Sequence, residues 1–330
     1  MLWPVMILAA CVLALVVVVA IAVYQFYGIR TMERAMKEAW GGIDSYEGEN
    51  ARYRLLVDDA AGAPPSAEEF AAGGAQYSTA TSLALADHVA RVQLAANDGH
   101  ERPADPPAAR GATLAGLFYP FDSQGREQAD GPVFGAAWVY GNGTMVVAFR
   151  ATVTDYEKRL DMMTHQEVVD AGALVHHGFA HVYEHYREAL QRAIDKARPR
   201  LVLLAGHSLG AAVATLAMYR LAHIDGAPAL GGYVYGSPRV GDPRFAQKFA
   251  ELQEAGRVTM WRESNRADFI TELPLAVTPN LRNVGEATHY EHVGHPRVFN
   301  ENHGALKHNH LLSVYIQNVR DIAAAAEATF

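Results

Sequence analysis

The stretch of sequence that decides the fold is residues 203–212, LLAGHSLGAA. An apolar run precedes Ser208 and an Ala-rich run follows it at once, which predicts a tight turn between a buried strand and a helix. Gly206 and Gly210 flank the serine where a side chain would collide with the neighbouring strand and helix. A G-x-S-x-G pattern alone is weak, but in this context it predicts a nucleophilic serine. The alternative is a Gly-rich turn with an incidental serine.

Strands and helices alternate on both sides of this turn. Two short β-rich runs, 133–140 and 144–149, are separated by Gly141-Asn142-Gly143, which predicts a hairpin. Further strands are expected at 201–205, 232–235 and 258–262, and helices at 181–196, 209–223, 242–252 and from 311 onward. This alternation predicts an α/β fold in which helices cover both faces of a mostly parallel sheet.

Serine is a weak nucleophile unless a histidine takes its proton and an acid orients that histidine. On strand–turn–helix scaffolds of this kind the chain order is Ser, then Asp or Glu, then His. The candidate acids after Ser208 are Asp225, Asp242 and Asp268. The C-terminal part also holds six candidate histidines: His289, His292, His295, His303, His308 and His310.

Six blocks in order resemble the class 3 lipases, which include filamentous-fungal triacylglycerol lipases, plant acyl hydrolases and diacylglycerol lipases. The blocks are VVAFRAT at 146–152, VHHGF at 175–179, the turn GHSLG, YGSPRVGD at 235–242, RESNRAD at 262–268 and HLLSVY at 310–315. The matching region runs from about residue 133 to 316, a little over half of the chain. The resemblance implies an α/β-hydrolase fold and cleavage of carboxylic esters without a cofactor.

The resemblance carries the family's catalytic acid to Asp268, within NRADFITELP at 265–274, where Thr271 replaces the family's first proline. Asp268 also follows a β-rich run, and catalytic groups of open α/β sheets lie at such strand ends. The family's catalytic histidine corresponds to His310, which opens the final helix with Tyr315 five residues later. His308, two residues earlier, is the rival candidate.

Two backbone donors are implied for the oxyanion of the tetrahedral intermediate. They are the N–H of Leu209 and the N–H of Thr152, with the Thr152 hydroxyl as a further donor. Ala151 stands where the family usually has glycine, and glycine there would allow a conformation that alanine resists. The residues between Thr152 and 176 correspond to the family's lid, where Met162 and Met163 fit an apolar flap and their charged neighbours fit a solvated helix equally.

Bulk properties and spacing exclude several other functions. The net charge is −8, so the chain lacks the basic excess that nucleic-acid binding needs. A single cysteine, Cys11, excludes an internal disulfide framework. The H-x-H of His308 and His310 could ligate zinc, but no H-E-x-x-H motif or carboxylate-paired spacing supports a metal site there. We expect no metal, no cofactor and no nucleic acid.

The N-terminal residues 1–27 differ from the rest of the chain. Residues 2–24 carry no charge, and at about 1.5 Å rise per residue they are long enough to cross a hydrocarbon core of about 30 Å. A cleaved secretory signal ending near Ala20 and Ala22 is the alternative, but the basic n-region is absent and the run is long. Three basic residues follow it: Arg30, Arg34 and Lys37. The positive-inside rule then puts the body in the cytoplasm.

The sequence thus predicts a transmembrane anchor at 1–27, a helical N-terminal extension and linker at 28–111, and an α/β-hydrolase domain at 112–330. Within the extension, helices are expected at 31–60 and 66–97. The expected substrate is a lipid ester, a glyceride or phospholipid, drawn from the membrane that holds the anchor. Two alternatives are an esterase for small soluble esters and a non-catalytic, membrane-tethered binding protein on a lipase fold.

Overall fold

The computed structural model describes residues 50–54, 57, 62–74, 76–98, 105–170, 172–279 and 287–327. The chain divides into two units, 1–45 and 46–330, of which the first lies outside the described residues. The predicted anchor at 1–27 and most of the predicted helix at 31–60 lie outside them as well. Within the described ranges, no helix has both the length and the apolar character that crossing a membrane requires.

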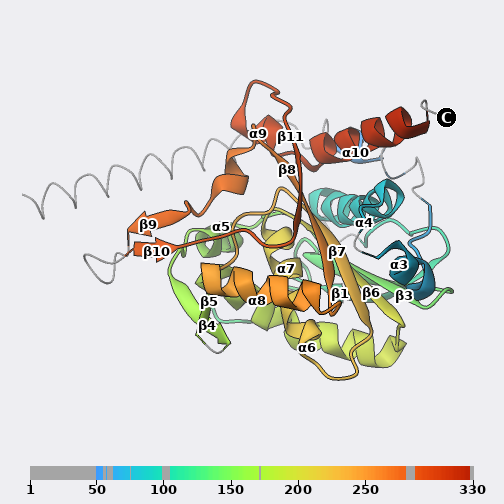
Figure 1. The fold of residues 1–330 in the computed structure, drawn as a ribbon, viewed down its shortest axis with the longest axis horizontal. Coiled ribbons are helices and arrows are strands. Elements are labelled where there is room, and N and C mark those ends of the chain that lie inside the picture. The colour runs from blue at the N-terminus through green and yellow to red at the C-terminus, as the bar shows by residue number, and fades with distance from the viewer. Residues whose placement is uncertain are drawn as a thin grey trace, which may run out of the picture. The chain divides into compact units, whose positions relative to one another are not determined.

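A seven-stranded sheet forms the centre of the second unit (Figure 1). Its strands lie in the order β1 (Ala112–Phe118), β2 (Gly135–Tyr140), β3 (Thr144–Phe149), β6 (Leu201–His207), β7 (Ala229–Tyr235), β8 (Thr259–Asn265) and β11 (His295–Phe299). The pairs β1–β2 and β2–β3 are antiparallel, and all later pairs are parallel. The predicted mostly parallel sheet of an α/β-hydrolase-like fold is therefore confirmed, as is the predicted hairpin.

The strand before the candidate serine, β6, lies in the middle of the sheet. All of its residues are buried, and Leu204 pairs with Val147 of β3 on one side and with Gly232 of β7 on the other. A central parallel strand is covered on both faces, which is why β6 is apolar at successive positions rather than at alternate ones.

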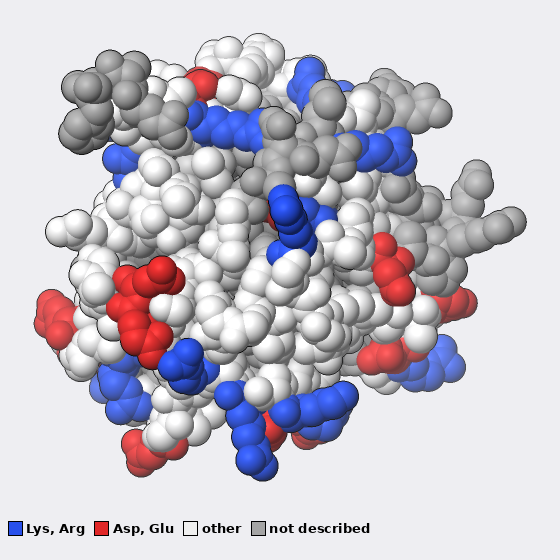
Figure 2. Space-filling view, turned by 90° about the vertical axis from the view of Figure 1, so that its right-hand side faces the viewer, with Lys and Arg blue, Asp and Glu red and all other residues white. Residues whose placement is uncertain are grey.

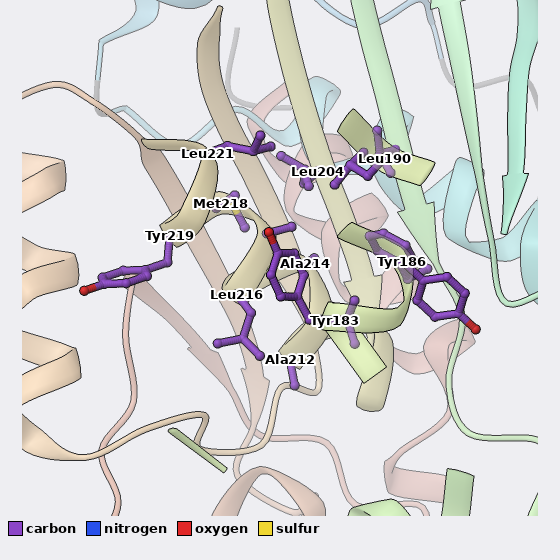
Figure 3. Close-up of a cluster of buried hydrophobic side chains, with 14 of the residues drawn as sticks. Tyr183, Tyr186, Leu190, Leu204, Ala212, Ala214, Leu216, Met218, Tyr219 and Leu221 are labelled. Carbon is purple, nitrogen blue, oxygen red and sulfur yellow. The ribbon is translucent and has the colours of Figure 1, made fainter. Parts of the chain in front are cut away.

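Helices cover both faces of the sheet (Figure 1). One face is covered by α6 (His177–Ala197), α7 (Leu209–Ala222) and α8 (Pro243–Glu254), which form one apolar core with it. Part of this core is drawn in Figure 3, where side chains from α6, α7 and β6 gather. The other face is covered by α4 (Thr79–Asp98) and α10 (Leu312–Glu327), which form a second core with it.

The described residues between 50 and 111 belong to the same compact unit as the sheet. The single helix expected at 66–97 is divided into α3 (Ala67–Gly73) and α4. Ser66 and Glu69 form a capping box that starts α3, and Gly74, with φ of 56°, ends it. Leu85 and Val89 of α4 lie in the core beside Trp138 of β2.

Several short elements were not predicted from the sequence. They are the two edge strands of the main sheet, β1 and β11, and the shorter elements α5 (Asp155–Asp161), the hairpin of β4 (Gln166–Asp170) and β5 (Ala173–His176), the 3-10 helix η1 (Phe269–Glu272), the pair β9 (Val277–Pro279) and β10 (Ala287–His289), and α9 (Leu306–Asn309). Most are too short to show a clear hydrophobic period.

On the face shown in Figure 2, acidic and basic side chains are interspersed around a broad uncharged area.

Candidate active site

Ser208 occupies the turn between β6 and α7, as predicted. Its backbone has φ of 57° and ψ of −122°, an unusual conformation for a residue with a side chain. A Cβ on Gly206 would lie 2.1 Å from the Gly210 carbonyl oxygen, and one on Gly210 would lie 2.4 Å from the carbonyl oxygens of Phe149 and Arg150. Only glycine fits these two positions, so the turn can present the serine at the carboxyl edge of the sheet.

Ser208, His310 and Asp268 lie in hydrogen-bonding contact although they are far apart in the sequence. His310 Nε2 is 2.8 Å from Ser208 Oγ, and His310 Nδ1 is 2.6 Å from Asp268 Oδ2. With Nδ1–H donating to the carboxylate, Nε2 is free to accept the serine proton. The arrangement can generate a nucleophilic alkoxide without any further group.

The tertiary fold holds His310 in place. It ends α9, directly before α10, and is 9% exposed. Gly236 lies against its ring, and a Cβ there would come within 3.1 Å of His310 Cε1. Gly236 also has φ of 56°, so two independent reasons favour glycine at this position of the YGSPRVGD block.

Asp268 is fully buried at the end of β8, where it caps η1. Its Oδ1 accepts the N–H of Ile270 at 2.9 Å, and its Oδ2 accepts both His310 Nδ1–H and the Tyr315 hydroxyl, the latter at 2.5 Å. Burial raises the pKa of Tyr315 well above its ordinary value, and the nearby Asp268 adds to this, so the phenol stays a donor. Tyr315 was a landmark in the sequence, but its bond to the acid was not predicted.

The rival candidates lie elsewhere. Asp225 is in the exposed turn between α7 and β7, at the opposite edge of the sheet from Ser208. Asp242 caps α8 by accepting the N–H of Phe245 at 2.8 Å. His308 is exposed, and His292 Nε2 is 2.9 Å from the Thr271 carbonyl oxygen.

The loop after β3, residues 150–154, is here called the oxyanion loop. Arg150 anchors it from a fully buried position. The guanidinium donates to the carbonyl oxygens of Val133 at 2.8 Å and Ala151 at 2.6 Å, and makes a bidentate pair with Glu157 at 2.9 and 3.0 Å. Its partner Glu157, on α5, was not predicted from the sequence.

Most backbone N–H groups of the oxyanion loop are already engaged. Glu157 Oε2 accepts those of Val153 at 2.8 Å and Thr154 at 3.0 Å, and Gln93 of α4 accepts that of Ala151 at 3.3 Å. The N–H of Thr152 has no hydrogen-bond acceptor among the described residues. Leu209 starts α7, so its N–H has no intrahelical acceptor either. Thr152 in the oxyanion loop and Leu209 after the serine thus each present an N–H group that can receive an anion.

The Thr152 hydroxyl is engaged by a carboxyl group. It donates to Asp161 Oδ2 at 2.7 Å, while Asp161 Oδ1 is shielded from solvent and has no partner. Burial raises the pKa of Asp161 to about 7, and the nearby Glu157 carboxylate adds to this rise. The hydrogen bond from Thr152 acts in the opposite direction and lowers the pKa. The hydroxyl, considered from the sequence as an oxyanion donor, is thus committed to Asp161.

Ala151 adopts no conformation that requires glycine. The described non-glycine residues with positive φ are Arg198 and Ser208, so Ala151 lies outside the left-handed region. The glycine-dependent conformation considered for this position is therefore not the one that Ala151 adopts.

His207 is a further group that the sequence analysis did not single out. Its ring is 4.7 Å from that of His310, and burial lowers the pKa of His207 well below its ordinary value, with repulsion from His310 as a second cause. The imidazole is therefore neutral and adds no charge beside His310.

The described residues contain no group of three or more His, Cys, Asp and Glu side chains that can hold a metal ion. Of the H-x-H pair, His310 has both ring nitrogens in contact with Asp268 and Ser208. The zinc interpretation of this pair therefore has no support in the geometry.

A serine in a strand–turn–helix elbow, in contact with a histidine and a buried acid on a mostly parallel sheet, is the arrangement that defines α/β-hydrolases. Residues 146–278 match the family model described as Lipase (class 3). This match spans about two fifths of the chain and contains five of the six sequence blocks, so the resemblance to the class 3 lipases is confirmed over these residues.

Relatives of known identity include a phospholipase A(1), the chloroplastic DAD1 of Arabidopsis thaliana, which is 31% identical over 163 residues. That match covers 42% of this chain and 36% of the relative, so only about a third of the relative is spanned. Among solved structures, lipase II from Rhizopus niveus is 20% identical with a TM-score of 0.42, covering 55% of this chain and 73% of that one. The triacylglyceride lipase of Rhizomucor miehei is 21% identical with a TM-score of 0.43, covering 57% and 66%.

Proposed function

We propose that this protein is a carboxylic ester hydrolase in which Ser208 is acylated, with His310 as general base and then general acid. The observation that carries the proposal is the continuous contact from Ser208 Oγ through His310 to Asp268, at 2.8 and 2.6 Å. His310 takes the serine proton and returns it to the leaving alcohol, and Asp268 holds the tautomer and stabilises the imidazolium. Water then attacks the acyl-enzyme with the same histidine as base.

The oxyanion is assigned to the N–H groups of Leu209 and Thr152. The support is that both lack an acceptor within the described structure, whereas the three other N–H groups at 151, 153 and 154 are taken. Backbone donors fixed before the reaction stabilise developing charge without reorganising, and one such donor is worth about 10²–10³ in kcat.

The proposed substrate is the ester of a lipid, a glyceride or phospholipid. The family and the phospholipase A(1) relative support this choice. Exposed apolar side chains lie on segments next to the catalytic groups: Met162 and Met163 follow α5, and Phe269 follows Asp268. We propose that an acyl chain bound near Ser208 contacts these side chains.

The proposal also includes anchoring through residues 1–27, with the hydrolase body in the cytoplasm. Its support is the uncharged run at 2–24 and the basic residues that follow it. Protease protection in sealed membrane vesicles tests the orientation. In vesicles whose cytoplasmic face points outward, we expect added protease to cleave the hydrolase body without detergent. Protection of the body in these vesicles would contradict the cytoplasmic orientation.

Hydrolysis of ester series by the full-length protein tests the substrate class. We expect turnover of long-chain glyceride or phospholipid esters in mixed micelles to exceed that of acetyl and butyryl esters, and Ser208→Ala to abolish it. Preference for the short, soluble esters would support the small-ester alternative. No turnover of any ester by folded wild-type protein would favour the non-catalytic alternative.

A further inference from the structure

We propose that Gln93 of α4 is a positioning residue for the oxyanion loop. The inference rests on the proposed function and extends it to the helix before residue 112, in which the sequence shows no motif. The inference gives α4 a role in positioning the oxyanion loop, in addition to covering one face of the sheet.

The contact is a hydrogen bond from the Ala151 N–H to Gln93 Oε1, at 3.3 Å. Gln93 is 8% exposed, so its amide is held away from solvent. Ala151 directly precedes Thr152, whose N–H is the proposed oxyanion donor. The other anchors of the loop come from Arg150 within it and from α5, so Gln93 is the anchor supplied by α4.

A chain of buried amides fixes the orientation of the Gln93 side chain. Gln93 Nε2 donates to Asn97 Oδ1 at 3.0 Å, and Asn97 Nδ2 donates to Asn50 Oδ1 at 3.0 Å. Because Nε2 is committed to Asn97, Oε1 faces Ala151 and a flipped amide would break both bonds. Asn50 and Asn97 are also buried, and burying amides is costly unless they are bonded.

The geometry of one peptide plane links this contact to catalysis. The Ala151 carbonyl and the Thr152 N–H belong to the same trans peptide and point in opposite directions. Arg150 holds that carbonyl at 2.6 Å, and Gln93 holds the N–H on the other side of the Ala151 Cα. Because hydrogen bonds hold the peptide groups on both sides of the Ala151 Cα, the Thr152 N–H can point in only one direction. Without Gln93, rotation about the Ala151 backbone bonds would turn the donor away from the oxyanion.

The test compares three variants of the full chain. Gln93→Met keeps the length of the side chain and removes both hydrogen bonds. Gln93→Glu keeps an acceptor oxygen within reach of Ala151. Tyr140→Phe is the matched control: it removes the 2.9 Å bond between Tyr140 and His88, another buried contact of α4 with the sheet, and touches no part of the loop. For each variant, kcat and KM on a soluble ester, the rate of labelling by a fluorophosphonate, and Tm are measured.

We expect Gln93→Met to lower kcat about tenfold, less than the loss of a whole oxyanion donor, with KM unchanged within about twofold. Labelling should slow in parallel. Gln93→Glu should keep most of the wild-type kcat, and Tyr140→Phe should lower Tm with kcat unchanged. Equal kcat in Gln93→Met and Tyr140→Phe, or no recovery by Gln93→Glu when its Tm is maintained, overturns the inference. If wild-type protein is itself neither labelled nor active, the proposed function fails and this inference fails with it.

Discussion

At the scale of single residues, the candidate site is a set of polar groups whose partners are almost all accounted for. Asp268 has both oxygens bonded, and Arg150 and Glu157 satisfy each other in a buried pair. Such a network is stable only when complete, because a buried group left without a partner costs far more than one bond contributes. Substitutions that remove one partner are therefore the most informative.

Tyr315→Phe removes the hydroxyl that donates to Asp268 and changes little else in the core around α10. A hydrogen bond to a charged group contributes about 1.5–3 kcal/mol, so we expect the free energy of unfolding to fall by about that amount. Activity should fall but persist, since His310 keeps its own bond to Asp268. Urea unfolding and ester hydrolysis measure the two effects. Loss of activity as complete as in Ser208→Ala would contradict a supporting role.

Asp161→Asn tests the raised pKa of the buried carboxyl group. The folded-state pKa is about 7 against an ordinary value of 3.8, so above about pH 4 the unfolded chain loses its proton while the folded chain keeps it. This penalty on folding grows up to about pH 7 and is constant beyond. The stability of Asp161→Asn relative to wild type should therefore rise from pH 4 to pH 7 and then level off. A difference in Tm that stays flat across this range would contradict the assignment.

At this scale the sequence was sufficient to choose the candidate catalytic residues that belong to recognisable sequence blocks. Asp268 and His310 were chosen over Asp225 and His308 from their blocks, and the structure brings the chosen pair together with Ser208. Gln93 and Asp161 were not predicted, because their contacts depend on how α4 and α5 pack. Thr154-x-x-Glu157 is a capping-box spacing that could have located α5, but not the pairing of Glu157 with Arg150.

At the scale of elements, the turn between β6 and α7 is tightly constrained by its two glycines, Gly206 and Gly210. Its glycines approach backbone atoms rather than flexible side chains, so nothing nearby can yield. The sequence predicted this turn because local chemistry alone sets its geometry. The break between α3 and α4 at Gly73 and Gly74 was missed, because an Ala-rich helical pattern continues across it.

Gly206→Ala should disrupt the turn. The added methyl would lie 2.1 Å from a carbonyl oxygen, so the backbone must shift, at a cost of about 1–3 kcal/mol or more. We expect fluorophosphonate labelling to be lost along with a lower Tm. Gly141→Ala is the matched control, because an added Cβ there meets nothing within 4 Å and its φ is not positive. If both variants label equally, the steric account of the turn is wrong.

At the scale of the whole molecule, one face of the sheet is covered by helices that lie before its first strand and after its last strand in the sequence. The core on one face joins α4, from before residue 112, to α10, from the C-terminus. The alternation of strands and helices was enough to predict a mostly parallel sheet with helices on both faces, but not its two edge strands, β1 and β11. It could not assign α4 to a face, since an Ala-rich helix with buried polar groups shows no clean apolar stripe.

Two truncations test whether α4 is part of the hydrolase unit. Removing residues 1–45 should leave a folded protein, because the compact unit spans 46–330. Removing residues 1–111 strips α4 from the sheet and exposes Trp138, Val146 and Leu203, so aggregation or a large fall in Tm is expected. A stable, cooperatively unfolding 112–330 fragment would contradict this and support the predicted domain boundary.

The measurement that tests the central claim most directly is mass spectrometry of the full-length protein after reaction with a fluorophosphonate. The account predicts one adduct, on the peptide that contains Ser208, formed by wild type and by Tyr140→Phe, absent from Ser208→Ala, and strongly slowed in His310→Ala. An unmodified Ser208 in folded wild-type protein, or an adduct on another residue that persists in Ser208→Ala, would contradict it.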